Sequence, residues 1–175
     1  AGCDIVLYKA CSTADSSPAV GSLGRAAEIG RDVFGERPVP VLVAQPDFGR
    51  WTVFGTHFAR EGDEVFRLDR QPTMSHHPTT PMTEADLRRH LAAQTSLTVG
   101  GVDFLAYDAG PDAVSARISG AGDVVVLDAL TDEHLTVAGA ATARLPRPVF
   151  AIGSGGLALG LGRVVGGEAA APLPT

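Results

Sequence analysis

Short apolar runs that alternate with helical patterns are the feature that most constrains how this chain can fold. A strand buried on both faces reads as a continuous apolar run, and such runs recur along the whole chain. Strands that alternate with helices predict an α/β fold, with a parallel or mixed sheet covered by helices on both faces. The predicted buried strands are residues 4–9, 41–44, 124–127 and 149–152, and the predicted helices are residues 20–34, 83–94, 112–118, 132–143 and 157–165.

The middle of the chain is less regular. Aromatic and β-branched residues predict one strand over residues 51–58, and an edge hairpin can pass through residues 65–68. Residues 70–82 contain three prolines and little apolar periodicity, which predicts a structured loop. Thr83 followed by Asp86 fits a capping box, so a helix is expected to begin there. Two further short strands are predicted at residues 97–99 and 102–105.

The composition indicates a folded domain without a nucleic-acid partner. Of 175 residues, 45% are hydrophobic and 19% are charged, which suits one globular domain. The net charge is -6 and Lys9 is the single lysine, so the clustered positive charge that nucleic acids require is missing. Cys3 and Cys11 lack metal-ligand spacing, and no apolar run has membrane length. We therefore expect a cytoplasmic protein with reduced thiols and no membrane partner.

Polar residues follow the first predicted strand. Lys9, Ser12 and Ser16 lie between that strand and the next helix, where hydroxyls, backbone N–H groups and the helix dipole can together hold an anion. The other interpretation is that Asp15, Ser16 and Ser17 only cap the helix, while Lys9 is solvated.

Arg50 and His77 are the candidates in the middle of the chain. Arg50 follows the second strand and can form a bidentate contact with a carboxylate or phosphate, or else occupy a surface turn. In the loop of residues 70–82, His77 can contact a substrate carboxylate or transfer a proton, or else be a structural imidazole. The adjacent histidines His76 and His77 have no acidic or cysteine partner in this loop, so no metal site is predicted. His57 and His90 are interpreted as structural.

A glycine-rich turn follows the last predicted strand. Gly153, Ser154 and Gly155 resemble a phosphate-binding turn, although a sharp turn that packs a helix against the sheet fits equally well. An interpretation of residues 153–162 as a dinucleotide fingerprint would predict a nicotinamide-dependent oxidoreductase. No acidic residue ends a following strand, so that match is poor.

Several segments, taken in order, resemble the four-carbon acid sugar kinases. They are YKACSTADSSPAVGSLGR from Tyr8, FGRWTVFG from Phe48, RQPTMSHHPTTPMTEADLRRHL from Arg70, VVLDALTDEHL from Val125 and FAIGSGG from Phe150. The resemblance spans almost the whole chain, and the block from Arg70 is the most specific.

The resemblance implies a Rossmann-like domain that binds the sugar acid, and a separate domain that binds ATP. The implied reaction is ATP-dependent phosphorylation of a hydroxyl of threonate, erythronate or a 3-oxo-tetronate, with Mg²⁺ accompanying the nucleotide. The positions carried over as substrate contacts are Lys9, Ser12, Asp15, Ser16, Arg50 and His77. A homodimer is left open, and a sugar-acid or anion-binding module without catalysis is the alternative.

The chain also departs from the family pattern. Family members begin with a strand and an Asp-Asp-x-Thr-Gly turn, whose carboxylate is a candidate catalytic base, and nothing here corresponds to it. We therefore assign no catalytic residue. Residues 1–165 are expected to form a partial sugar-acid-binding domain, incomplete at its N-terminal end. Residues 166–175 are expected to be a linker toward an absent nucleotide-binding domain, which would hold most of the ATP and Mg²⁺ contacts.

Overall fold

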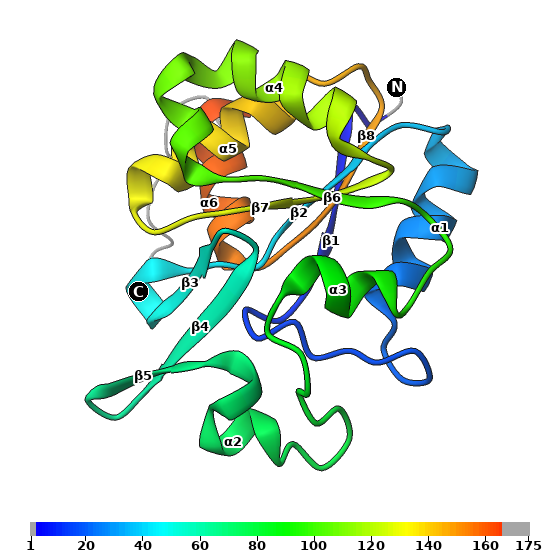
Figure 1. Cartoon of the computed structure of the whole chain (residues 1–175). Helices are drawn as coiled ribbons and strands as arrows, with labels where there is room; N and C mark the ends of the chain where they lie inside the picture. The colour runs from blue at the N-terminus through cyan, green and yellow to red at the C-terminus, as the bar shows by residue number, and fades with distance from the viewer. Residues whose placement is uncertain (1–2, 166–175) are drawn as a thin grey trace, which may run out of the picture.

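The computed structural model describes residues 3–165, which form two sheets. The larger is a five-stranded parallel sheet with strand order β1-β8-β2-β7-β6, and the smaller is a three-stranded antiparallel sheet with order β3-β4-β5 (Figure 1). The predicted α/β fold is thus confirmed. The strands are β1 (Ile5–Lys9), β2 (Val39–Leu42), β3 (Arg50–Val53), β4 (Thr56–Glu61), β5 (Glu64–Arg67), β6 (Val99–Val102), β7 (Val124–Leu127) and β8 (Val149–Gly153).

Helices cover both faces of the large sheet (Figure 1). Helices α4, α5 and α6 pack on one face, and α1 and α3 pack on the other. The α-helices are α1 (Leu23–Phe34), α2 (Pro72–Ser75), α3 (Leu87–Ala92), α4 (Gly110–Ala121), α5 (Asp132–Ala143) and α6 (Gly155–Val165).

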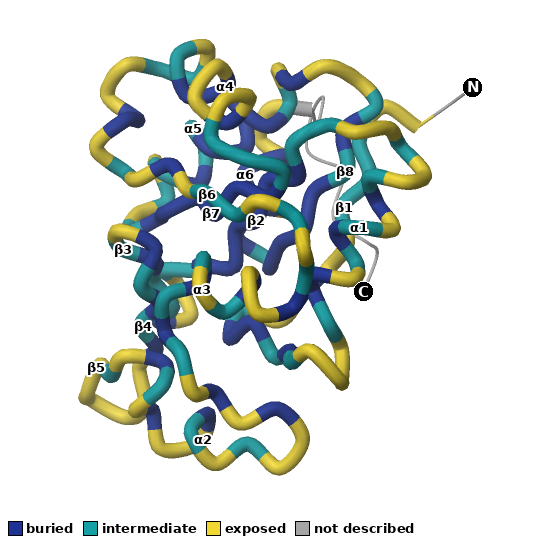
Figure 2. Tube along the Cα trace, turned by 45° about the vertical axis from the view of Figure 1, so that its right-hand side comes forward, coloured by how far each residue is buried: buried dark blue, intermediate teal, exposed yellow. Residues whose placement is uncertain are grey.

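The run VVVL of β7 shows why the central strands are apolar throughout. Val125 and Leu127 belong to the core under α4, α5 and α6, whereas Val124 and Val126 belong to the core on the opposite face. All four residues are buried, because successive side chains point to opposite faces and both faces are covered. Figure 2 shows this buried centre, with β5 and the turns around α2 largely exposed.

The small sheet differs from the sequence-based expectation. The predicted single strand over residues 51–58 is instead two strands, β3 and β4, joined by a tight turn at Phe54 and Gly55. Both turn residues have positive φ, 50° and 78°, as a two-residue hairpin of type I′ requires. Phenylalanine is an unusual residue for that conformation, so the sequence pattern predicts no turn at this position. The hairpin expected near residues 65–68 is confirmed as β5, an edge strand.

Other boundaries also differ. Residues 70–82 are not loop throughout, because the short helix α2 lies inside them with Pro72 in its first turn. Helix α3 is capped by Asp86, whose side chain accepts from the Arg88 N–H at 2.9 Å, so Thr83 is not its N-cap. The two strands predicted after it are one strand, β6, followed by a 3-10 helix (Phe104–Ala109). Residues 166–175, the predicted linker, lie outside the described residues.

Candidate functional site

The candidate site lies at the C-terminal edge of the large sheet, where parallel strands present their following loops. Lys9 ends β1 and pairs in register with Gly153 at the end of β8. Its exposed side chain donates from Nζ to the carbonyl oxygen of Ala10 at 3.0 Å. The Ala10 N–H donates to the Gly153 carbonyl at 2.8 Å, so the loop after β1 starts beside the glycine-rich turn. The structure therefore brings the predicted lysine and the predicted phosphate turn together.

The loop after β1 is held by its own polar side chains. The Thr13 hydroxyl donates to the Asp15 carboxylate at 2.5 Å, which fixes Asp15 against the loop. Ala14 has a φ of 51°, a left-handed conformation that non-glycine residues rarely adopt, and it is buried. Backbone strain of this kind persists only where the surrounding structure holds it in place.

Ser16 lies inside the protein rather than at its surface. It is 2% exposed, donates to the Ala14 carbonyl at 2.8 Å and accepts from Nε2 of Gln94 at 3.0 Å. Gln94 in turn accepts from the Leu23 N–H at 2.9 Å, while the N-cap Ser22 accepts from the Arg25 N–H. These N–H groups at the start of α1 are not free, which differs from the expectation of unpaired donors for an anion. The cap is Ser22 and not the predicted residues 15–17.

Arg50 lies on the inner face of the small sheet, and its guanidinium is only partly satisfied. Its Nη1 donates to three backbone carbonyls at 3.0 to 3.1 Å, those of Phe48, Gly49 and Arg60. Its Nε is buried and has no hydrogen-bond partner among residues 3–165. A buried donor without an acceptor costs about 1–3 kcal/mol, so this nitrogen is suited to a ligand oxygen.

His57 lies on the same inner face, diagonal to Arg50 across the β3–β4 pair. It is fully buried, and this burial lowers its pKa to about 4, with the Arg50 charge contributing in the same direction. Its Nε2 lies 2.9 Å from the Ser12 carbonyl oxygen, and its Nδ1 lies 2.9 Å from the Thr52 hydroxyl. The neutral imidazole thus joins the loop that contains Ser12 to the small sheet, which also carries Arg50.

Asp128 holds the tight turn of the small sheet in place. It directly follows β7, is 1% exposed, and accepts from the N–H groups of Phe54 and Gly55 at 2.6 and 2.9 Å. Burial raises the pKa of this carboxyl above its usual value. Asp128 is not among the predicted site residues, although its position directly after a buried strand is a usable signal.

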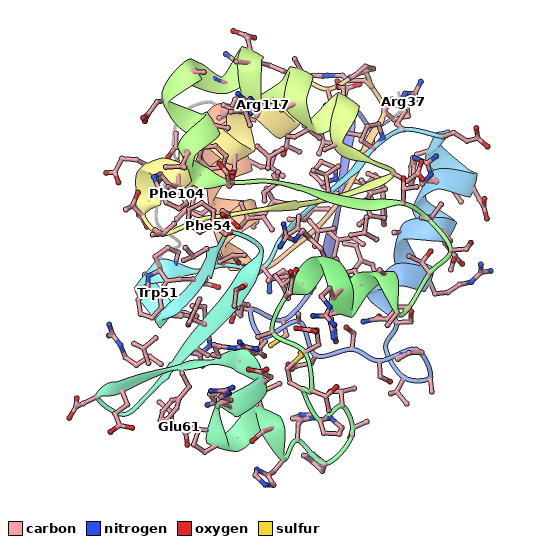
Figure 3. The ribbon with its side chains drawn as sticks, viewed as in Figure 1. Arg37, Trp51, Phe54, Glu61, Phe104 and Arg117 are labelled. Carbon is pink, nitrogen blue, oxygen red and sulfur yellow. The ribbon has the colours of Figure 1, made fainter. Side chains whose placement is uncertain are left out.

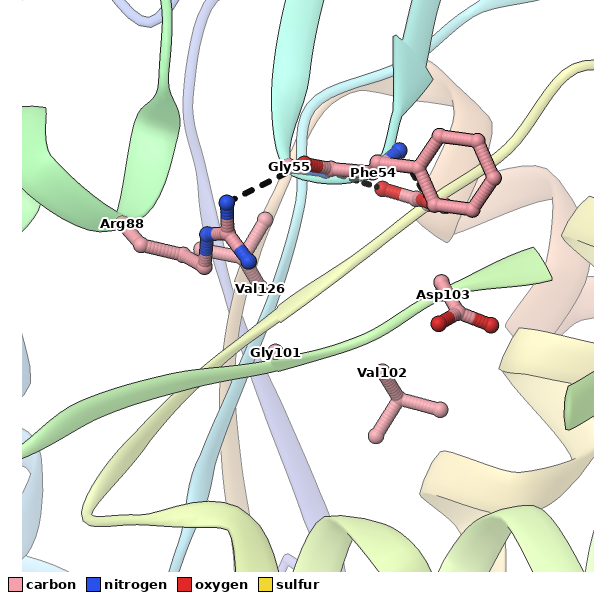
Figure 4. A pocket seen from close by; sticks show the side chains of 8 residues that line it. Phe54, Gly55, Arg88, Gly101, Val102, Asp103 and Val126 are labelled. Atoms are coloured by element: carbon pink, nitrogen blue, oxygen red, sulfur yellow. Dashed lines mark hydrogen bonds between the residues drawn. The ribbon is translucent and has the colours of Figure 1, made fainter. Parts of the chain in front are cut away.

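A small polar pocket adjoins this turn (Figure 4). It has a volume of about 70 Å³, and Arg88 enters it from α3 and donates to the Phe54 carbonyl at 3.1 Å. Asp103 reaches it from the end of β6. Neither Arg88 nor Asp103 is among the predicted site residues. On the opposite, outer face of the small sheet, Arg60 stacks on Trp51, which is labelled in Figure 3.

His77 belongs to a separate, self-supporting segment. Its Nδ1 accepts from the Thr80 N–H at 3.0 Å, so the imidazole is bonded to loop backbone. Glu61 at the end of β4 anchors this segment by accepting from the Gln71 side chain and the Thr73 hydroxyl. Among the described residues, no hydrogen bond joins His77 to Lys9, Ser12 or Arg50.

The turn after β8 is tightly packed. Ser154 is fully buried, and its hydroxyl donates to the Ala44 carbonyl at 3.0 Å and accepts from the Gly156 N–H at 3.1 Å. A Cβ on Gly153 would lie 2.9 Å from the Leu42 carbonyl oxygen and closer still to Leu157. The Ser154 side chain therefore caps α6, and only backbone groups of this turn remain for a phosphate.

The fold defines an α/β domain whose parallel sheet presents polar loops at its C-terminal edge. The chain belongs to a known family, described as the sugar-binding N-terminal domain, which matches residues 1–161. The resemblance to four-carbon acid sugar kinases is thereby confirmed.

Curated relatives carry kinase names. The chain is 45% identical over 140 residues to the 3-oxo-isoapionate kinase of Paraburkholderia graminis, a match that covers 79% of the chain and 30% of that protein. It is 35% identical over 167 residues to the 3-oxo-tetronate kinase of Escherichia coli, a match that covers 93% of the chain and 40% of that protein. The chain thus spans less than half the length of these relatives.

Solved structures agree with the fold. A Haemophilus influenzae protein is 28% identical with a TM-score of 0.82, over 95% of the chain and 40% of that protein. A Bordetella bronchiseptica protein, described with bound citrate and as a domain-swapped dimer, is 26% identical with a TM-score of 0.72, over 93% of the chain and 36% of that protein. No helix among residues 3–165 is long and apolar enough to span a membrane.

Proposed function

We propose that this chain is the sugar-acid-binding part of an ATP-dependent kinase that phosphorylates a hydroxyl of a four-carbon sugar acid. The family and the names of the curated relatives support this class of reaction. The substrate candidates are threonate, erythronate and a 3-oxo-tetronate. The name of the Paraburkholderia relative adds 3-oxo-isoapionate, a branched five-carbon acid, as a candidate outside that class. We further propose a cytoplasmic location, and a homodimer for which the Bordetella dimer is the support.

The observation that carries the proposal is the state of the Arg50 side chain. Because three carbonyls hold Nη1, the remaining edge of the guanidinium consists of Nε and Nη2, which point in parallel. Two parallel N–H donors match the two oxygens of a carboxylate, and Nε has no other partner among the described residues. Lys9 would add a second positive charge, and Ser12 and Asp15 would contact hydroxyls of the acid. Ser16 supports that loop from inside, and His77 remains a proposed contact.

ATP and Mg²⁺ are proposed to bind mainly outside this chain. Among residues 3–165, no group of three or more His, Cys, Asp or Glu side chains is placed to hold a metal ion. The residues present do not fit a complete Mg²⁺ site, so we derive no step of phosphoryl transfer from them. Any contact of Gly153, Ser154 and Gly155 with a phosphate would use backbone N–H groups, because the Ser154 hydroxyl is already bonded.

The test is a calorimetric titration of the full-length protein with each candidate sugar acid, and with citrate as a simple polycarboxylate. We expect a sugar acid to bind, and Arg50→Lys to weaken binding about 10- to 100-fold, because a lysine cannot replace the bidentate contact. Arg60→Lys is the matched control, since Arg60 lies on the outer face of the same sheet, and it should change affinity less than about twofold.

Three outcomes would contradict the proposal in whole or in part. If the unsubstituted protein binds no sugar acid, the function is wrong. If Arg50→Lys remains folded and binds as the Arg60→Lys control does, the function stands but Arg50 is not the carboxylate contact. Binding of sugar acids without any ATP-dependent phosphorylation would favour the non-catalytic module instead.

A further inference from the structure

A continuous set of hydrogen bonds links two loops at the C-terminal edge of the large sheet through the small sheet. Thr52 in β3 exchanges two backbone hydrogen bonds of 3.1 Å with Ala129, just after β7. Its side-chain hydroxyl contacts Nδ1 of His57 in β4, whose Nε2 contacts the Ser12 carbonyl in the loop after β1. The connection therefore runs from β7, through the small sheet, to the loop proposed to bind the sugar acid.

The chemistry of these partners assigns the protons. A carbonyl oxygen can only accept, so Nε2 of His57 carries the hydrogen and donates to Ser12. In the neutral imidazole Nδ1 is then an acceptor, and the Thr52 hydroxyl donates to it. His57, Thr52 and Ala129 are each 0% exposed, so the donors and acceptors that these three residues contribute are shielded from water.

The small sheet is itself fixed to the large one. The Asp128 carboxylate accepts both N–H groups of the β3–β4 turn, and the Thr52–Ala129 bridge lies just beyond it along the hairpin. The position of His57 is therefore determined by the end of β7. Because His57 is bonded to the Ser12 carbonyl oxygen, it in turn holds the loop that contains Ser12 and Asp15 in place relative to β7.

We propose that His57 is a positioning residue for the sugar-acid site, which sets the Ser12 loop against Arg50. This inference rests on the proposed function. The loop that contains Ser12 and the strands that carry Arg50 are far apart in the sequence. Among the described residues, they share no hydrogen bond other than the one between His57 and the Ser12 carbonyl oxygen. His57 does not contact the substrate in this role.

A matched pair of substitutions in the full-length protein tests the idea. The side-chain amide nitrogen of His57→Gln can take the place of Nε2, whereas the shorter His57→Asn reaches only as far as Nδ1. We expect His57→Asn to raise the KM for the sugar acid about tenfold, with kcat and the KM for ATP changed less than about twofold, and His57→Gln to restore most of the loss. His76→Asn, at an exposed histidine, is the control that should behave as the unsubstituted protein.

Amide hydrogen exchange of residues 11–17, measured by mass spectrometry, gives a readout that does not depend on catalysis. We expect faster exchange in His57→Asn than in His57→Gln or the unsubstituted protein. Equal exchange in all three, or an equal KM for the sugar acid in the Asn and Gln variants, would overturn the positioning role. If the unsubstituted protein phosphorylates no sugar acid, the proposed function fails, while the exchange result still decides whether His57 positions the loop.

A milder substitution covers the case in which His57→Asn does not fold. Thr52→Val removes the donor to Nδ1, so the tautomer that turns an unprotonated Nε2 toward the Ser12 carbonyl becomes accessible. We expect a KM for the sugar acid about threefold higher and faster exchange of residues 11–17. An unchanged KM together with unchanged exchange in this variant would contradict the inference.

Discussion

Buried polar residues decide how the two sheets of this protein meet. His57 donates to the Ser12 carbonyl, and Asp128 accepts from the N–H groups of the β3–β4 turn. Each side chain therefore bonds to the backbone of another segment. The His57 and Asp128 side chains are buried, so losing either partner would leave a buried polar group unpaired at a cost of about 1–3 kcal/mol. These residues therefore affect the candidate site by holding its segments in position, and not by contacting a ligand.

The buried imidazole of His57 predicts a pH dependence of stability. Its pKa is about 4 in the folded protein and 6.5 unfolded, so between these values the unfolded state binds more protons. The contribution of His57 to the free energy of unfolding is therefore complete above pH 6.5 and is lost as the pH falls toward 4. Between pH 7 and 4.5, unsubstituted protein should lose about 2 kcal/mol more stability than His57→Gln.

Urea unfolding of the chain, followed by the fluorescence of its single tryptophan, measures this difference. Other groups titrate in the same range, so the quantity of interest is the difference between the two proteins at each pH. Parallel stability curves for the two proteins would show that His57 can be protonated without unfolding.

At the scale of elements, glycines set the closest helix contact. A Cβ on Gly160 of α6 would lie 2.1 Å from the Leu135 carbonyl oxygen in α5, and one on Gly139 would lie 2.2 Å from the Gly160 backbone. Real atoms do not approach so closely, so the two helices can pack at this distance only without these side chains. Helix α6 in turn places the turn after β8 at the candidate site.

Gly160→Ala is therefore expected to destabilise the protein by about 1–3 kcal/mol, because α5 and α6 must separate. Gly162→Ala is the matched control on the same helix. A Cβ there meets nothing within 4 Å, and alanine favours a helix over glycine by about 1 kcal/mol, so this variant should be equally or more stable. Thermal unfolding of both variants measures the effect, and similar losses in the two would show that helix packing is not the cause.

The elements that sequence patterns predicted well are those whose burial is periodic. The runs of β7 and β8 and the helix α5 were found where they lie, because both faces of the sheet are covered. The small sheet was not resolved into its strands, since Phe54 occupies a turn position that glycine or asparagine usually takes. Its conformation is imposed by Asp128, which lies far away in the sequence.

At the scale of the whole molecule, the chain spans less than half the length of the kinases to which it is similar. Phosphoryl transfer requires the terminal phosphate of a nucleotide to lie in line with the acceptor hydroxyl, and metal ions would neutralise its charge. Residues 3–165 present no complete metal site. We expect the isolated chain to release no ADP from ATP in the presence of a sugar acid, whereas the full-length protein does so. A coupled ADP assay on both proteins checks this, and sugar-acid-dependent ADP release by the isolated chain would place the catalytic machinery here.

The sequence by itself determined the fold class and the polar loops after β1, β2 and β8, because burial periodicity and loop composition are local properties of the chain. Its motifs carried the resemblance to the family. Only the tertiary structure decided what those residues do. In the folded protein Ser16 is buried, and the Ser154 hydroxyl is bonded at the N-terminus of α6. Nε of Arg50 has no hydrogen-bond partner among the described residues. Hydrogen bonds between distant segments produce these outcomes, and no local pattern records which donor will meet which acceptor.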